Sequence, residues 1–314
     1  MSLESIIQGI RTHIEAKADS LLPKAHSAIL KGVVFGDKNE LPRGLKENLR
    51  RTGTIHIVVA SGYNLSVVGL YVMSLFQLLI SAQRRTLMFI LTELVLLFYV
   101  LLIGFQAPII RAFIMSSLTI LGKVFGRERS GVWILVLSGF IMVVIKPAWI
   151  TEISFQLSFL ATLGIMLYTE KIKNGLQHFF DKFSLVRKLG ITYLLDDLAT
   201  TLSAIIFTWP IVSYYFGSVS LLSPLVNILV LWVVPILTVY GGFTLLLPAF
   251  LGILSHYLSW LLELLLSYFI FVVTYFGNLP MASFNFELTL PSMLFYFIFV
   301  LVIGFSPHHE TKNI

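Results

Sequence analysis

The chain has 314 residues, of which 57% are hydrophobic and only 12% are charged, and its formal net charge is +6. This composition lies far from that of soluble globular domains and indicates a polytopic membrane protein. The absence of cysteine excludes disulfides, thiol catalysis, zinc–thiolate sites and iron–sulfur clusters.

Residues 1–53 are predicted to form an interfacial N-terminal segment. Apolar residues follow a helical period over residues 2–30 and leave one polar face. Such an amphipathic helix would lie on the membrane surface, and the alternative is a helix that packs on the protein's own loops. A charged turn region follows at 37–46, and a short amphipathic piece ends at Arg51. We expect no cleavable signal peptide, because the first thirty residues lack a compact apolar core.

Residues 54–306 are predicted to form one all-α domain, a polytopic transmembrane helical bundle, and residues 307–314 a polar tail. Crossing about 30 Å of hydrocarbon takes roughly 20 apolar residues, so the apolar runs predict nine or ten membrane segments, some broken or re-entrant. The first seven are expected at 55–80, 87–105, 108–123, 131–147, 153–169, 198–216 and 219–240, with two or three more between 241 and 306.

Basic residues cluster in alternate loops of this bundle. Of the 22 Lys and Arg, only Lys312 lies beyond Lys188. The clusters lie at Arg84 and Arg85, at 123–129 and at 171–188. The positive-inside rule places these loops in the cytoplasm and residues 1–53 outside, although a re-entrant first span would reverse the assignment.

The stretch RRTGTIHIVVASGYNLSVVG keeps polar groups in an apolar run, where each must find a partner. Ser61 and Gly62 are expected to break the helix or to let it pack closely. His56 and Asn64 are eight residues apart and would share one polar stripe, which faces other helices or a water-filled path. A serine hydrolase built from Ser61 and His56 is the weaker alternative, because no carboxylate is placed to orient the histidine.

Charged residues within the predicted spans include Glu93, Arg111 and Lys146. An ionised side chain at the bilayer centre costs roughly 2.5–3.5 kcal/mol, so such residues face the bundle interior or snorkel to an interface. Together with Arg50 and Arg51, the two basic ones are expected at the non-cytoplasmic end. A basic mouth there would attract an anion.

Two further polar sets lie in the second half of the bundle. Glu152, Gln156 and Ser158 open the fifth predicted span. Pro210 and the segment 216–227 supply two prolines and a glycine where a helix should break. Transporters place binding sites and gates at broken helices, but such breaks are also ordinary loop ends.

None of the seven histidines has the spacing that builds a metal site. We therefore expect no metal, no cofactor and no enzymatic activity. The chain also lacks a Walker motif, so the energy for any transport would come from a partner ATPase, the proton gradient or DNA-binding proteins that pull from inside.

Four blocks in this order resemble the competence domain of ComEC-type DNA-uptake channels: FGDKNELPRGLKENLRRTGTIHIVVASGYNLSVVG, QAPIIRAFIMSSL, PAWITEISFQLSFLATLGI and WPIVSYYFGSVSLLSPLVNILVLWVVP. The first is similar to that family's pattern of Leu-Gly-Asp, then Phe/Leu-Arg-Arg-x-Gly, then His-x4-Ser-Gly-x-His. Matched residue by residue, the resemblance marks Gly36, Asp37, Arg50, Arg51, Gly53, His56, Ser61, Gly62, Arg111, Ala112, Phe155, Gln156, Leu157, Ser158, Phe216, Gly217, Pro224 and Asn227.

The resemblance implies passage of single-stranded DNA across the bacterial cytoplasmic (inner) membrane during natural transformation. The chain departs from the pattern at Asn64, which replaces the second histidine, so a titrating histidine pair is in doubt. Many members also carry an OB-like domain and a metallo-β-lactamase-like domain, which we expect separate chains to supply here, and an oligomer is compatible with the sequence.

The resulting hypothesis is a membrane channel component for single-stranded DNA, in contact with membrane lipids and with a cytoplasmic ATPase as a further partner. Because bases are scarce after Lys188, the path would be a short constriction with a basic outer mouth. The alternative is a standalone membrane transporter for a smaller anionic or lipid-linked substrate. The predicted substrate and channel residues are Arg50, Arg51, His56, Ser61, Gly62, Asn64, Arg111, Gln156, Ser158 and Asn227.

Overall fold

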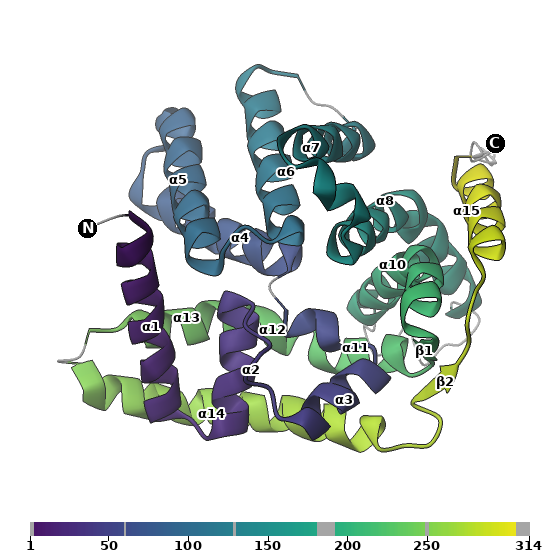
Figure 1. Cartoon of the computed structure of the whole chain (residues 1–314). Helices are drawn as coiled ribbons and strands as arrows, with labels where there is room; N and C mark the ends of the chain where they lie inside the picture. Colours follow the sequence, from purple (N-terminus) through teal and green to yellow (C-terminus); the bar gives the residue numbers. More distant parts are fainter. Residues whose placement is uncertain (1–2, 60, 128–129, 181–191, 249–250, 306–314) are drawn as a thin grey trace. The chain divides into compact units, whose positions relative to one another are not determined.

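The structure is a computed structural model, and it describes residues 3–59, 61–127, 130–180, 192–248 and 251–305. This part of the chain is nearly all helical, as predicted (Figure 1). Two compact units are present. Unit 1 comprises Met1–Ser158 with Ser220–Ser283, and unit 2 comprises Phe159–Val219 with Phe284–Ile314.

Two helices, and not one, occupy the amphipathic region predicted at residues 2–30. They are α1 (Leu3–Leu21) and α2 (Lys24–Phe35). Pro23 separates them, because proline has no N–H to donate and disfavours a helical conformation in the residue before it. The apolar face of α1 packs on other helices of unit 1, so the helix is held by the protein itself.

The first predicted span starts later than expected, after α3 (Arg43–Arg51) and the short turn η1 (Ile55–Ile57). Gly53 has a φ of 70°, a left-handed conformation that glycine adopts without strain, and it turns the chain after α3. The span itself is α4 (Gly62–Leu79), and Ser61 caps it by accepting the N–H of Asn64 at 3.3 Å. The predicted break at Ser61 and Gly62 is therefore confirmed.

Three helices of unit 1 pack against one another, and we call them the α4–α5–α6 bundle. The short turn η2 (Ala82–Arg84) joins α4 to α5 (Arg85–Ile103), which is followed by α6 (Ala107–Val124). The next helix, α7 (Gly131–Ile145), packs on α6. The turn η3 (Pro147–Thr151) then leads into α8 (Ile153–Phe180).

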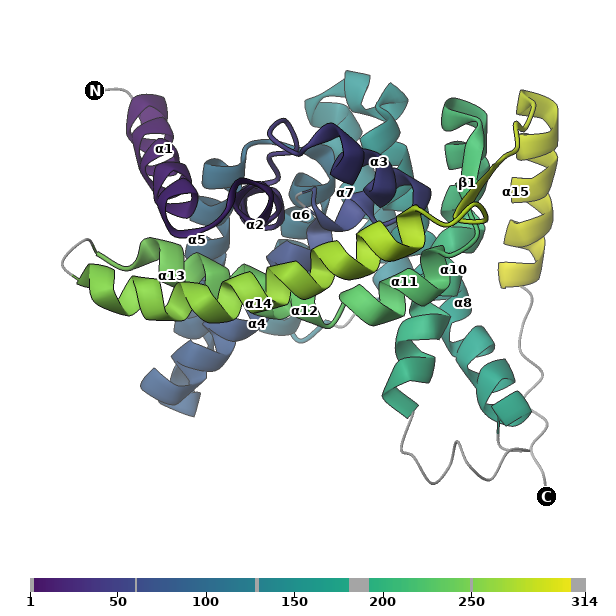
Figure 2. The same cartoon turned by 90° about the horizontal axis from the view of Figure 1, so that it is seen from below.

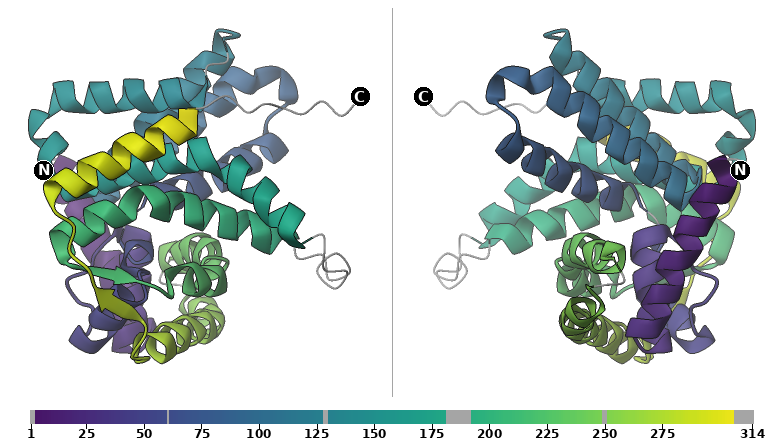
Figure 3. Two further views of the ribbon diagram at one scale, coloured as in Figure 1. Left: turned by 90° about the vertical axis from the view of Figure 1, so that its right-hand side faces the viewer. Right: turned by 90° about the vertical axis from the view of Figure 1, so that its left-hand side faces the viewer.

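Unit 2 is built from the long part of α8, α10 (Thr192–Phe216) and α15 (Leu290–Phe305), and Figure 3 shows α15 beside α10. Pro210 lies inside α10 and does not break it. The break comes at Gly217, which has a φ of 63°. Two short strands, β1 (Ser218–Ser220) and β2 (Ser283–Asn285), pair in a two-stranded sheet.

A bent helix pair, whose bend lies outside the break predicted at 216–227, lies in the segment that returns to unit 1. α11 (Ser223–Val230) is followed by α12 (Val233–Ile236), the π-helical turn η4 (Leu237–Gly241) and α13 (Gly242–Leu246), and the two halves are bent by 42°. The last helix of this unit, α14 (Gly252–Gly277), packs along α2, α3 and α11 (Figures 1 and 2). A Cβ on Gly277 would lie 2.7 Å from the Cβ of Asn48, so α14 and α3 touch closely.

Within the described residues, five helices are long and apolar enough to cross a membrane, or six if the bent pair counts as one span. They are 62–79, 85–103, 153–180, 194–216 and 252–277. The predicted number of nine or ten is not confirmed. Apolar side chains cover much of the surface, with Leu78 84% exposed and Ile253 79% exposed, as a lipid-facing surface requires.

Candidate functional site

The closest helix contact at the predicted site is made by Gly62, in the first turn of α4. A Cβ at this position would lie 3.0 Å from the Cβ of Ala112 and 3.1 Å from Nη2 of Arg111. It would also lie 3.3 Å from the carbonyl oxygen of Pro108. The absence of a side chain therefore lets the N-terminal end of α4 lie directly against α6.

Arg111 reaches this contact from α6 and is only 7% exposed. Its Nε donates to Oγ of Ser158 at 3.0 Å, and Nη1 lies 3.5 Å from the sulfur of Met115. The guanidinium group thus lies beside the N-terminal end of α4, where the helix dipole is positive. We call Ser61, Gly62, Arg111 and Ser158 the Arg111 cluster.

The electrostatics of the Arg111 cluster favour an anion. The guanidinium charge is permanent, and the positive end of a helix dipole favours phosphate and carboxylate groups. Both effects are stronger in a partly buried, low-dielectric environment than in water. Four of the residues predicted from the sequence are brought together here.

Asn64 also lies at this end of α4, but it faces another helix. Its side chain is 1% exposed, and Nδ2 donates to the carbonyl oxygen of Val33 in α2 at 2.8 Å. Within the described part of the chain, Oδ1 is buried and has no hydrogen-bond partner. Asn64 therefore fastens α4 to α2 and leaves one buried acceptor that costs free energy.

The predicted stripe of His56 and Asn64 is wrong. His56 belongs to the turn η1, where Nδ1 lies 2.9 Å from the carbonyl oxygen of Gly53 and the ring is exposed. Asn64 is buried in α4. The eight-residue spacing would align the two side chains only on one continuous helix, and the Ser61 cap ends that continuity.

The four bases predicted for the outer mouth have separate surroundings. Arg51 donates from Nη2 to the carbonyl oxygen of Leu279 at 2.9 Å, which holds α3 to the end of α14, and Arg50 is exposed. Lys146 forms an ion pair with Glu152 at 3.0 Å, and both side chains are partly exposed. Of these four, Arg111 is the buried one.

Gln156 and Asn227 have surroundings of their own. Gln156 donates from Nε2 to the carbonyl oxygen of Ile150 at 3.0 Å, so it joins the start of α8 to η3. Asn227 lies in α11 and is buried, and Oδ1 has no partner among the residues that the structure describes. A buried acceptor without a described partner in a broken helix fits the predicted polar role of this segment.

An ionic cluster around the buried Lys31, with the half-exposed Asp19 and Glu40, was not predicted from the sequence. Lys31 is 2% exposed and donates from Nζ to Oδ1 of Asp19 at 2.9 Å and to Glu40. Burial alone would lower the pKa of Lys31, but hydrogen bonds and charges from Glu40 and Asp19 outweigh it and raise that pKa. The one signal was a lone lysine in the apolar run of α2.

Asp19 shows the matching change. Burial tends to raise the pKa of Asp19, but hydrogen bonds from Ser27 and Lys31 outweigh it and hold the pKa below its ordinary value of 3.8. Oγ of Ser27 donates to Asp19 at 2.6 Å. The cluster fixes α1, α2 and the loop before α3 to one another.

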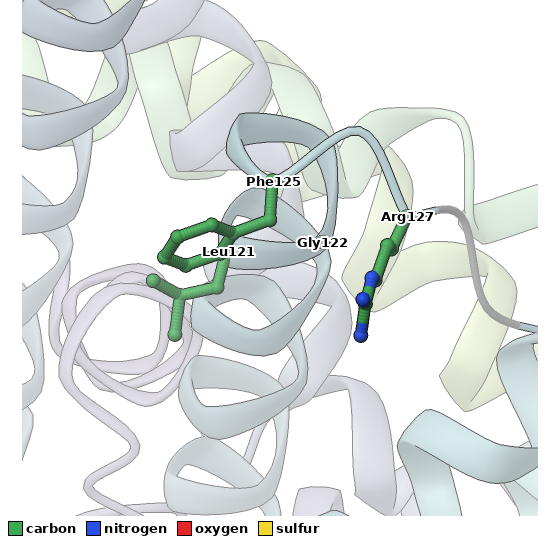
Figure 4. A pocket seen from close by; sticks show the side chains of 4 residues that line it. All are labelled: Leu121, Gly122, Phe125 and Arg127. Atoms are coloured by element: carbon green, nitrogen blue, oxygen red, sulfur yellow. The ribbon is translucent and has the colours of Figure 1, made fainter.

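Two surface hollows lie away from these residues. One, of about 530 Å³, is at the C-terminal end of α6, where Leu121, Gly122, Phe125 and Arg127 line it (Figure 4). The other, of about 470 Å³, lies between α1 and the end of α13. Among the described residues, no group of three or more His, Cys, Asp or Glu could hold a metal ion.

A family model described as Competence protein matches residues 33–310. The chain is similar to ComE operon protein 3 of Bacillus subtilis (strain 168), with 25% identity over 308 residues, which cover 95% of this chain and 36% of that protein. An uncharacterized protein of Aquifex aeolicus (strain VF5) is 30% identical over 202 residues, which cover 60% of this chain and 46% of that protein.

The chain therefore spans less than half the length of these two relatives. No solved structure matches it at a significant level. Because the family model covers most of the chain, and because the described residues include five candidate membrane spans, this multi-pass membrane protein belongs to the Competence protein family.

Proposed function

We propose that the chain is a membrane component of competence DNA uptake and that it passes single-stranded DNA through the bacterial cytoplasmic membrane. Membership of the Competence protein family and similarity to ComE operon protein 3 support this role. The observation that carries the substrate class is the Arg111 cluster, where a buried guanidinium lies beside the N-terminal end of α4.

A single-stranded nucleic acid offers a phosphate at every nucleotide, and phosphate contacts are independent of sequence. Arg111 would neutralise one phosphate at a time and release it as the strand advances. Arg50, which is exposed on α3, would supply a further contact of the protein with a DNA phosphate. Base stacking on aromatic side chains would add to such contacts in any single-strand path.

The proposal includes no catalytic step by this chain. Two observations support a non-catalytic role. The hydroxyl oxygen of Ser61 accepts the N–H of Asn64 in the helix cap, and His56 lies on the separate turn η1. Separate OB-like and metallo-β-lactamase-like chains, together with a cytoplasmic ATPase, would complete the uptake machinery.

The test is the salt dependence of single-stranded DNA binding to the purified chain and to Arg111→Ala. For single strands, log K decreases with log salt, and the magnitude of this negative slope is smaller by roughly 0.7 for each phosphate contact that is lost. Arg111→Ala should therefore bind more weakly and with a flatter slope, whereas Arg111→Lys should keep most of the slope. Lys146→Ala is the matched control, because Lys146 is exposed and paired with Glu152.

Two results would contradict the proposal. One is DNA affinity and slope that are equal in the wild type and Arg111→Ala. The other is the absence of DNA binding by the intact chain at low salt. Circular dichroism of each variant in the same detergent separates loss of binding from loss of fold.

A second candidate function follows from the size of the Arg111 cluster. One buried guanidinium beside one helix end matches a single phosphate or carboxylate, so a transporter for a smaller anionic or lipid-linked substrate would use the same residues. Liposomes that contain the chain would then take up an anion in the absence of DNA, and Arg111→Ala would abolish that uptake.

A further inference from the structure

A carboxylate lies near the middle of one candidate membrane span. Glu93 belongs to α5, the span at Arg85–Ile103, whose mean hydropathy is 2.5. An ionisable group at such a depth is costly in a bilayer and usually has a function. The proposed passage of DNA assigns no role to this residue.

Two hydroxyl groups of α6 contact both oxygens of this carboxylate. Oγ of Ser116 donates to Oε1 of Glu93 at 2.9 Å, and Oγ of Ser117 donates to Oε2 at 2.7 Å. Oγ of Ser117 also lies 3.0 Å from the carbonyl oxygen of Phe113, one turn earlier in α6. A single hydroxyl proton thus has two acceptors within reach.

This geometry satisfies Glu93 in either protonation state. When Glu93 is ionised, Ser117 donates its hydroxyl proton to Oε2. When Glu93 is protonated, its O–H can donate to Oγ of Ser117, which then turns its own proton to the carbonyl oxygen of Phe113. Since only hydrogens move, the helices need not separate when the proton binds or leaves.

Other titratable groups lie on α5 and on the elements that pack against it. The described elements that pack on α5 are α1, α2, α4, α6 and η2. Their titratable residues, with those of α5 itself, are Glu4, Arg11, His13, Glu15, Lys17, Asp19, Lys24, His26, Lys31, Tyr63, Tyr71, Arg84, Arg85, Tyr99, Arg111 and Lys123.

The partners of the nearest of these groups lie elsewhere. Arg11 bonds to Glu15 and to the carbonyl oxygen of Ile103, at the end of α5. Tyr99 donates to the carbonyl oxygen of Val34. In the described part of the chain, no basic nitrogen forms an ion pair with Glu93 within 4.0 Å.

A metal cation is a poorer ligand for this site than a proton. Oxygen-binding cations take about six or more oxygen ligands, whereas the described contacts here are one carboxylate and two hydroxyls that donate to it. We propose that Glu93, held by Ser116 and Ser117 in the α4–α5–α6 bundle, is a proton-binding site that loads and releases a proton within the membrane.

Labelling with dicyclohexylcarbodiimide tests this site in the purified full chain. This apolar reagent takes the proton of a protonated carboxylic acid and forms an adduct with the resulting carboxylate. Peptide mass mapping should find the adduct on Glu93, in an amount that falls as the pH rises. Glu93→Gln should remove it, and the ion-paired Glu152 should stay unlabelled.

Ser117→Ala tests the role of the Ser117 hydroxyl, whose proton turns between Glu93 and the carbonyl oxygen of Phe113. Loss of one hydrogen bond to the ionised form should extend the labelling of Glu93 to higher pH. Ser66→Ala is the matched control, because the hydroxyl of Ser66 bonds to Gly62 of its own helix, and it should leave the titration unchanged.

An infrared titration gives a second readout, since a protonated carboxylic acid has a carbonyl band that disappears on ionisation. That band should be absent in Glu93→Gln. The proposal is overturned if Glu93 shows neither adduct nor band, if its labelling is the same at every pH, or if Ser117→Ala titrates like the wild type. None of these outcomes depends on DNA, so the proposed function and this site can fail separately.

Discussion

At the scale of single residues, Gly62 is the position where the candidate site tolerates least change. Gly62→Ala places a methyl group 3.0 Å from the Cβ of Ala112, and backbone of α6 lies close behind it. Overpacking of this kind costs about 1–3 kcal/mol, so the midpoint of thermal unfolding in detergent should fall.

Gly69→Ala on the same helix is the matched control for that prediction. Its nearest neighbour would be the end of the Leu96 side chain at 3.3 Å, which can move. Gly69→Ala should therefore lower the midpoint of thermal unfolding by less than Gly62→Ala does. Equal losses in the two variants would contradict the view that Gly62 is required for the contact of α4 with α6.

Single residues also show what the sequence could not predict. Ser61 and Gly62 were recognised as a helix break from their residue types alone. The position of His56 was not, because the apolar run before Ser61 does not distinguish a turn from a helix. That choice depends on the left-handed Gly53 and on a cap hydrogen bond, and both appear only in three dimensions.

At the scale of elements, the Lys31 cluster joins α1 to α2 and to the loop before α3. The lowered pKa of Asp19 adds stability that is present above its ordinary value of 3.8 and is lost as the pH falls through the folded value. The raised pKa of Lys31 adds stability that is present below 10.5 and is lost as the pH rises through its folded value.

Asp19→Asn should therefore unfold at a lower temperature than the wild type at neutral pH, and the difference should shrink below a pH of about 3.8. Thermal unfolding in detergent at several pH values measures it. Glu47→Gln, on the exposed side of α3, should show no such dependence. A difference that stays constant in acid would mean that the ion pairs do not stabilise α1.

Helix ends were less predictable than helix existence. A break within 216–227 was expected from prolines and a glycine, and it is present at Gly217. The bend between α11 and α13 lies after that segment and was not expected. Pro210 carries the same signal, yet α10 continues through it to Phe216. Whether a proline breaks a helix depends on how its neighbours satisfy the freed carbonyl groups, which local sequence does not specify.

At the scale of the whole molecule, the membrane character and the family were readable from the sequence, whereas the number of spans was not. Four blocks in a fixed order are specific, and the family model confirms them over residues 33–310. Apolar runs alone do not separate a full span from a shorter apolar helix. Gly131–Ile145 and Leu290–Ile303 are such short apolar helices.

The orientation in the membrane remains a prediction, and the cysteine-free chain allows a direct test of it. Ser81→Cys and Ser130→Cys should react with a membrane-impermeant maleimide from the cytoplasmic side, because they lie beside the basic loops. Thr151→Cys should react from the opposite side. Reaction of positions 81 and 151 from one side would contradict the predicted crossing of α5, α6 and α7.

The central claim is that single-stranded DNA reaches the Arg111 cluster, and photo-crosslinking measures this most directly. In Ser158→Cys, the new thiol is labelled with a benzophenone maleimide, which places the photoreactive group beside the guanidinium that Ser158 contacts. Ser74→Cys, on the exposed side of α4, is the control, since its hydroxyl bonds only to Leu70 of its own helix in the described contacts. We predict DNA adducts at position 158 that high salt removes, and few at position 74. Equal adducts at both positions, or none at 158, would contradict the account.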